Sequence, residues 1–156
     1  TLAHRLLSEL DLQPSGFVTL PYFINGQRRG HYLHSLVDCP GQLNDLPISV
    51  LQAPGRSIGI PDTFATLGVS CLNQSLTAPS DCILLDEIGR FETSVEPFLT
   101  VVRTIFAQTD KPVLAVIQKE PLPFLDELRA WPNCLHLDLD QVEQASAYQM
   151  MLSAWR

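Results

Sequence analysis

The feature that most constrains the fold is a short apolar run, Cys82–Leu85, that ends abruptly in two adjacent carboxylates, Asp86 and Glu87. Turn-forming residues at 79–81 precede it, and an apolar run between turn signals is typical of a strand buried on both faces of a parallel sheet. Open α/β sheets bind their ligands outside the carboxyl ends of such strands. The run therefore predicts an α/β fold in which the two acids stand at a ligand-binding edge.

Two interpretations of these acids are open on the residues alone. In a Walker B strand, Asp86 holds the Mg²⁺ of a nucleotide directly or through water, and Glu87 polarises the attacking water. In the alternative, both side chains face water at the end of a structural strand. The residues that follow, Ile88–Glu92, favour the Walker B interpretation because they match a known signature.

The string ILLDEIGRFE, residues 83–92, resembles the hydrophobic-DEIGKME signature of a small family of P-loop nucleoside triphosphatases. That family includes thermophilic archaeal and bacterial members and the animal cancer-related nucleoside triphosphatase. Walker B strands in general lack the Ile-Gly-basic-apolar-Glu tail, so the signature is fairly specific. Arg90 and Phe91 stand where the family usually has Lys and Met, and Arg and Lys are not equivalent at a phosphate site.

A second part of the chain also resembles this family. Gly16–Thr19 matches its Gly-Phe-x-Thr strand, and Gly26–Gly30 matches its turn and Arg-x-Gly ribbon. Two departures remove contacts that relatives could make. The acidic residues that usually follow the strand are replaced by Leu-Pro at 20–21, and an Asn-Arg-Asp near the C-terminal end is replaced by Asp-Leu-Asp at 138–140.

The phosphate-binding motif G-x-x-x-x-G-K-[ST] does not occur in the 156 residues. The opening Thr-Leu-Ala-x-x-Leu-Leu is what commonly follows Gly-Lys-Ser or Gly-Lys-Thr in P-loop proteins. We therefore expect residues 1–156 to be a single NTPase-like domain that begins just after the phosphate loop. The chain as given is expected to hydrolyse ATP or GTP poorly, because the lysine and the amide cradle are absent.

Local patterns predict the remaining elements. Asp62 is expected to cap the second helix, and Asp140–Glu143 to form a capping box for the last one. Helices are expected over 1–12, 61–76, 93–109, 124–130 and 140–155, and strands over 16–20, 22–24, 30–37, 48–51, 83–85, 113–117 and 134–137.

The expected fold class is α/β, a mainly parallel sheet flanked by helices, with an inserted antiparallel β-ribbon. It is P-loop NTPase-like, with the first strand and the phosphate loop missing. A right-handed crossover through the 93–109 helix requires strands 83–85 and 113–117 to be parallel. We expect both to be buried, with Asp86 and Gln118 at the same edge of the sheet.

The resemblance implies Mg²⁺-dependent hydrolysis of nucleoside 5′-triphosphates to diphosphates, broad in base. It places Asp86 at the metal, Glu87 at the attacking water, Thr1 near the α-phosphate and Gln118 as a sensor of the γ-phosphate. One alternative is a non-catalytic P-loop relative that binds a partner through its sheet edge or vacated pocket. Another is a flavodoxin-like binding module, which needs a phosphate loop that the sequence does not offer.

The composition restricts the kinds of partner that the chain is expected to bind. The net charge is −7 without a basic stripe, so no nucleic-acid partner is expected. The four cysteines are widely spaced, and Cys82 and Cys134 each begin an apolar run, so they are expected to be buried thiols. With no signal peptide and no long apolar span, a cytoplasmic protein without a membrane partner is expected. The sequence leaves the oligomeric state open.

Overall fold

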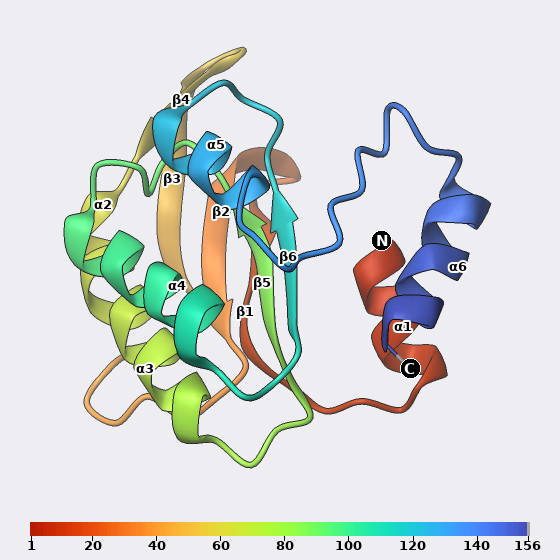
Figure 1. The fold of residues 1–156 in the computed structure, drawn as a ribbon. Helices are drawn as coiled ribbons and strands as arrows, with labels where there is room; N and C mark the ends of the chain where they lie inside the picture. Colours follow the sequence, from red (N-terminus) through yellow and green to blue (C-terminus); the bar gives the residue numbers. More distant parts are fainter. Residues whose placement is uncertain (156) are drawn as a thin grey trace.

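A mixed sheet of six strands, in the order β4-β3-β2-β1-β5-β6, forms the centre of the computed structural model, which describes residues 1–155 without the side chain of Gln108 (Figure 1). Strands β1, β5 and β6 run parallel to one another, and β1 to β4 form an antiparallel ribbon. The predicted α/β class with its ribbon is therefore confirmed. The strands are β1 (Pro14–Ile24), β2 (Gln27–Ser35), β3 (Leu46–Ala53), β4 (Arg56–Gly59), β5 (Cys82–Ile88) and β6 (Val113–Ile117).

Helices cover both faces of the sheet. On one face lie α3 and α4, and on the other α1 and α6 lie side by side (Figure 1). The helix expected from residue 61 is interrupted by a π-helical segment, η1. The helices are α1 (Leu2–Glu9), α2 (Pro61–Thr63), η1 (Phe64–Gly68), α3 (Val69–Thr77), α4 (Glu96–Gln108), α5 (Pro123–Arg129) and α6 (Gln144–Trp155).

Strand β5 supplies side chains to two separate cores. Successive residues of a strand point to opposite faces, so Ile83 and Leu85 join the large core against α3 and α4. Cys82 and Leu84 join a smaller core against α1. All four are at most 1% exposed, as expected for a strand buried on both faces.

The crossover between β5 and β6 has the predicted geometry. The two strands pair in parallel, with Leu84 opposite Leu114, which confirms the topology expected of a P-loop sheet. The expected burial of the second strand is wrong. Val113–Ile117 is only half-buried, because β6 is the edge strand of the sheet in the part of the chain that the structure describes.

The ribbon contains two strands that differ from the predicted ones. Residues 16–20 and 22–24 form one continuous strand, β1, that runs through Pro21. Pairing with β5 ends at Val18, so Pro21 lies where β1 is an edge on that side, and edges tolerate proline. Strand β4 is not among the predicted strands; it begins at Arg56 and pairs with β3.

Three further expectations are wrong. Ile60, and not Asp62, precedes the second helix, because Pro61 takes the first helical position. The expected strand 134–137 is an exposed loop, and Cys134 is an exposed thiol. Residues 140–143 form turns ahead of α6, which begins at Gln144, so they are not its capping box.

Candidate functional site

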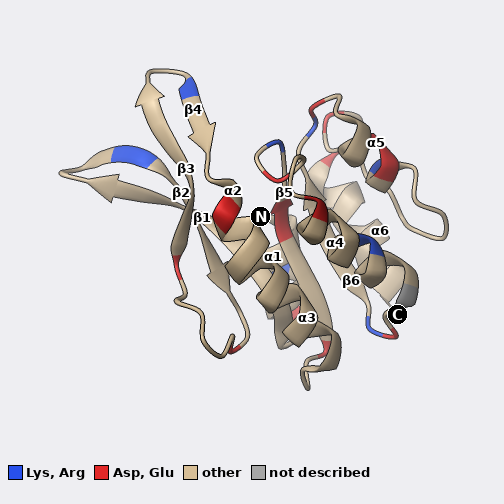
Figure 2. Cartoon of the chain, turned by 90° about the vertical axis from the view of Figure 1, so that its left-hand side faces the viewer, with Lys and Arg blue, Asp and Glu red and all other residues tan. Residues whose placement is uncertain are grey.

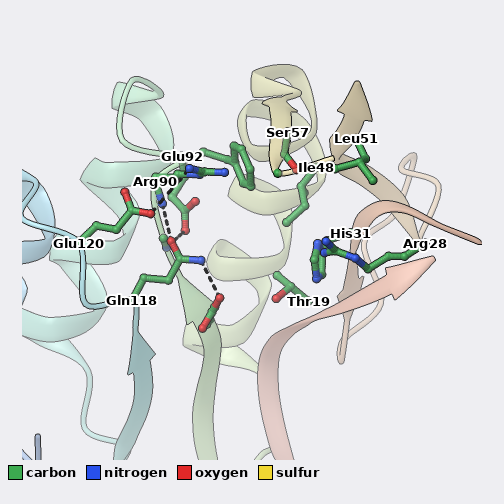
Figure 3. A pocket seen from close by; sticks show the side chains of 14 residues that line it. Thr19, Arg28, His31, Ile48, Leu51, Ser57, Arg90, Glu92, Gln118 and Glu120 are labelled. Atoms are coloured by element: carbon green, nitrogen blue, oxygen red, sulfur yellow. Dashed lines mark hydrogen bonds and ion pairs between the residues drawn. The ribbon is translucent and has the colours of Figure 1, made fainter. Parts of the chain in front are cut away.

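A cavity of about 310 Å³ opens at the carboxyl ends of β5 and β6, between these strands and the ribbon (Figure 3). It forms where β1 and β5 part, because their pairing ends at Val18 and Asp86. Figure 3 shows Arg28 and His31 on the ribbon wall, facing Arg90 and Gln118 on the opposite wall. The lining residues divide into a ribbon group, Thr19, Arg28, His31, Ile48, Leu51, Gly55 and Ser57, and a strand-end group, Glu87, Gly89, Arg90, Phe91, Glu92, Gln118 and Glu120.

Glu87 is held in this cavity by Gln118. The Gln118 Nε2 donates a hydrogen bond to Glu87 Oε1 at 2.7 Å. Its amide oxygen accepts from the backbone N–H of Arg90 at 3.0 Å, and since a backbone N–H can only donate, this bond fixes which end of the amide faces Glu87. Asp86 and Gln118 lie at the carboxyl ends of neighbouring strands, as expected, but the acid that Gln118 contacts is Glu87.

Glu92 stabilises the turn that presents the backbone N–H of Arg90 to Gln118. Its side chain is 2% exposed, and its Oε1 accepts from the backbone N–H of Gly89. Burial raises the pKa of Glu92 to about 8, and the nearby carboxylate of Glu87 raises it as well. Glu92 is therefore largely protonated at neutral pH, and it holds the 89–92 turn that presents the N–H of Arg90 to Gln118.

The ribbon wall adds two nitrogen-bearing side chains. Partial burial and the neighbouring guanidinium of Arg28 lower the pKa of His31, while Glu87 across the cavity raises it. A mainly neutral imidazole and a cationic guanidinium therefore face the acidic wall. Such a mixture suits a ligand that carries both phosphate oxygens and hydrogen-bonding ring atoms.

The side chain of Asp86 lies against α1, on the face of β5 that also carries Cys82 and Leu84. Its Oδ2 is 2.7 Å from His4 Nε2 on α1. Thr1 caps the same helix, with its Oγ1 accepting from the backbone N–H of His4 at 3.3 Å. The structure thus brings Asp86 together with Thr1 at the N-terminal end of α1, and Glu87 together with Gln118 in the cavity.

Sequence reasoning missed His4 and Glu92. His4 is 82 residues from Asp86, and no local signal points to their contact. Glu92 was visible in the DEIGRFE string, and its spacing of three residues from Gly89, just after a buried strand, is the signal that could have identified a turn-stabilising acid.

The donor set on the described residues fits Mg²⁺ in one limited sense. Within residues 1–155, there is no group of three or more His, Cys, Asp or Glu side chains that could hold a metal ion. Nucleotide-bound Mg²⁺ needs only one or two protein carboxylates, since phosphate oxygens and water complete its shell. Asp86, at the strand end beside α1, is a carboxylate of this kind.

None of the helices in residues 1–155 combines the length and the apolar character that a membrane span needs.

Comparison with known proteins gives consistent matches along the chain. The family model described as NTPase matches residues 1–147. The nucleoside-triphosphatase THEP1 of Thermotoga sp. (strain RQ2) is 29% identical over 151 residues, which cover 96% of this chain and 84% of that protein.

Two solved structures share the fold. The crystal structure of THEP1 from the hyperthermophile Aquifex aeolicus has a TM-score of 0.68 at 18% identity, over 96% of this chain and 90% of that one. The solution structure of a human cancer-related nucleoside triphosphatase has a TM-score of 0.71 at 19% identity, over 99% of this chain and 89% of that one.

Proposed function

The chain belongs to the NTPase family, and on that premise we propose that it hydrolyses nucleoside 5′-triphosphates to diphosphates and phosphate with Mg²⁺. The observation that carries the proposal is the contact between Glu87 and an oriented Gln118 amide at the carboxyl ends of two parallel strands. Ligands of open α/β sheets bind at this edge. The proposed substrate lies across it, with its phosphates toward β5.

Glu87 is the proposed catalytic residue. Gln118 takes one carboxylate oxygen of Glu87, and the other faces the cavity, where it can accept a hydrogen bond from a water. Phosphoryl transfer depends mainly on positioning and electrostatics. A carboxylate locked in one orientation lowers the cost of aligning that water with the γ-phosphate.

Gln118 has a different role in this proposal from the expected γ-phosphate sensor. Both ends of its amide are engaged, one with Glu87 and the other with the backbone of Arg90. We therefore assign Gln118 to positioning Glu87. A direct contact with phosphate would have to use the second N–H of the Gln118 amide, because the first is donated to Glu87.

We propose that Asp86 and Thr1 contact the substrate on the side of β5 that faces α1. The N-terminal end of α1, with Thr1 as its cap, carries partial positive charge that favours an anion such as the α-phosphate. Asp86 would hold Mg²⁺ directly or through water, in competition with its present partner His4. When bound, the ion would neutralise the charge that develops on the phosphate oxygens.

We also propose a cytoplasmic location. All four cysteines, Cys39, Cys71, Cys82 and Cys134, are free thiols. Free thiols are the usual state of cysteines in the reducing cytosol. Expression of a fluorescent fusion, followed by cell fractionation, tests this location.

A pair of conservative substitutions distinguishes the roles of the two acids. Glu87→Gln is expected to lower kcat by about 10²–10⁴-fold and leave nucleotide affinity nearly unchanged, because it removes the acceptor for water. Asp86→Asn is expected to weaken Mg²⁺-nucleotide binding, because an amide replaces the charge that faces the metal. Phosphate release and nucleotide titration measure both effects.

Glu120→Gln is the matched control, since Glu120 lines the same cavity but its side chain is 43% exposed. It is expected to keep kcat within about threefold, as exposed ionic contacts contribute little. The 156-residue chain and a form extended by a strand and phosphate loop are assayed together. Turnover in either form that survives Glu87→Gln would remove Glu87 from the mechanism. Nucleotide binding without turnover in both forms would favour the non-catalytic alternative.

A further inference from the structure

One face of the ribbon is apolar and uncovered. Cross-strand pairing places its residues in two rows, Leu20–Tyr32–Pro47 and Tyr22–Gly30–Val50–Ile58, because residues directly opposite each other share a face. Ile24, two residues after Tyr22, extends the same face. We call this surface the ribbon face and define it as Leu20, Tyr22, Ile24, Tyr32, Pro47, Val50 and Ile58.

The apolar side chains of the ribbon face are more exposed than those of a sheet face that packs against the core. Ile24 is 55% exposed and Ile58 44%, and Leu20 and Val50 are exposed to similar extents. Tyr22 and Tyr32 border a shallow hollow of about 330 Å³, with Pro47 and the acidic Asp45 on its wall. Contiguous exposed apolar surface of this kind marks a site for a partner, and the hollow offers a place for one large anchoring side chain.

The same side of the sheet is covered by helices a short distance away. Val18 precedes Leu20 by two residues in β1, so both point to one face. Val18 packs against Ala3 and Leu7 of α1, within the smaller core. The ribbon face therefore continues a surface on which a helix already packs, beyond the N-terminal end of α1.

Charge identifies the chemistry of the occupant. The segments 14–35 and 46–59 contain no Asp or Glu, although the whole chain has a net charge of −7. They contain three arginines, Arg28, Arg29 and Arg56, which lie at the two turn ends of the ribbon. Figure 2 shows blue and no red on these two tips. Arg28 faces the cavity, so an acidic group on a partner would meet Arg29 and Arg56 at these tips, away from Asp45 at the hollow.

We propose that the ribbon face binds an amphipathic helix of a partner protein, with apolar side chains on the ribbon face and acidic side chains toward the arginines. Seven side chains are far fewer than the 20–30 residues per side of a standard stable interface, which disfavours a second copy of this chain. Most members are aliphatic or proline, whereas single-stranded nucleic acid is bound on aromatic stacking platforms. A helix laid on a sheet uses both the flat rows and the charged rim.

A designed helical peptide tests this inference. The probe carries Leu at positions i, i+3, i+4 and i+7 and Glu on both flanks, with a fluorescent label, and is titrated with the full chain. We expect binding that weakens as salt is raised, because surface charges are screened. The same peptide with Lys in place of Glu is expected to bind at least tenfold more weakly, and the peptide with Ser in place of Leu to lose binding.

Substitutions in the protein complete the test. Two double variants are made, V50S/I58S and R29E/R56E. Each is expected to weaken binding of the acidic peptide at least tenfold. L135S is the matched control, since Leu135 is 47% exposed but lies outside the ribbon, and it should leave binding unchanged. None of these positions lines the cavity at the strand ends, and unchanged thermal melting shows that the fold is intact.

Several results would overturn the proposal. Equal affinity for the Glu and Lys peptides would exclude the charge argument. A dimer in light scattering that V50S/I58S abolishes would assign the face to a second copy. Preferential binding to anionic vesicles or to an oligonucleotide over the acidic peptide would assign it to a membrane or a nucleic acid. These readouts do not depend on turnover, so failure of the proposed hydrolase activity leaves the test valid.

Discussion

At the scale of residues, the adjacent acids Asp86 and Glu87 have partners on different elements of the fold. Glu87 is oriented by a neutral amide, and Asp86 by the imidazole of His4. One acid therefore faces the cavity and the other faces the N-terminal end of α1. A substrate that uses both must cross the end of β5.

The positioning role of Gln118 predicts a selective loss of rate. Gln118→Leu keeps much of the side-chain volume but removes the donor to Glu87 and the acceptor from Arg90. One hydrogen bond is worth about 1 kcal/mol, so kcat is expected to fall about five- to tenfold with little change in nucleotide affinity. Phosphate release against substrate concentration separates kcat from KM, and a change confined to KM would instead indicate a phosphate contact.

The buried acid Glu92 predicts a pH dependence of stability. Its pKa is about 8 in the folded chain and 4.5 ordinarily, so between these values the folded state holds a proton that the unfolded state has lost. The free energy of unfolding should then fall as pH rises through this window, with a slope of up to about 1.4 kcal/mol per pH unit from this group. Stability from protonation is full below pH 4.5 and lost above 8.

Glu92→Gln removes the titration and keeps the shape of the side chain. Urea unfolding from pH 5 to pH 8 should show a flatter profile for this variant than for the wild-type protein. At the alkaline end the variant should be the more stable of the two. Glu120→Gln, on the exposed rim, should reproduce the wild-type slope, and a Glu92→Gln profile parallel to the wild type would contradict the assigned pKa.

At the scale of elements, local patterns predicted the strands whose composition is uniform. Residues 82–85 of β5 and all of β6 are apolar, and the turn implied by the family match at Gly26–Gly30 lies between β1 and β2. The errors occur where tertiary pairing decides. Only the position of Pro21 beyond the β1–β5 pairing lets β1 continue, and the apolar run at 134–137 has no strand to join in the described structure.

The candidate site divides in the same way. Glu87 and Gln118 could be predicted, because both follow apolar strands that a right-handed crossover makes parallel. His4 could not, because its contact with Asp86 depends on how α1 packs on the sheet. Local sequence patterns predict which residues lie at the ends of strands. Contacts with residues on other elements can be identified only from the folded structure.

Close pairing of β1 with β5 predicts that Gly16 cannot be replaced. Its φ is +94°, and a Cβ would lie 1.9 Å from the carbonyl oxygen of Leu84. Gly16→Ala is expected to cost more than about 4 kcal/mol or to prevent folding, since it forces the strands apart. Gly41→Ala is the control, with φ +79° but nothing within 4 Å of the Cβ, and should cost about 1–2 kcal/mol of backbone strain. Denaturant unfolding compares the two, and equal costs would contradict this account.

At the scale of the whole molecule, the two ends of the chain are packed together. Tyr148 of α6 is 2% exposed, donates its hydroxyl proton to Glu9 of α1, and lies under the guanidinium of Arg5. Helix α1 carries Thr1 and His4, so α6 fixes the helix that forms one side of the candidate site. The last helix is thus connected to the site without touching it.

Substitutions of Tyr148 measure how much the packing of α6 on α1 contributes to the stability of the fold. Tyr148→Phe loses one hydrogen bond and is expected to cost about 1 kcal/mol, whereas Tyr148→Ala empties a buried site and is expected to cost about 3–5 kcal/mol. Thermal unfolding gives both values, and limited proteolysis should cut α6 faster in the alanine variant. Equal protection of α6 in the two variants would show that this packing does not hold the helix.

The alternation of β5 ties the chemistry of the site to the hydrophobic pattern that folds the chain. A slip of β5 by one residue would turn Ile83 and Leu85 toward α1, and it would turn Leu84 and Asp86 toward α4 at the same time. Neither exchange can occur alone. The two cores thereby fix the register of β5, and a chain that folds stably has already placed Asp86 on the side of α1.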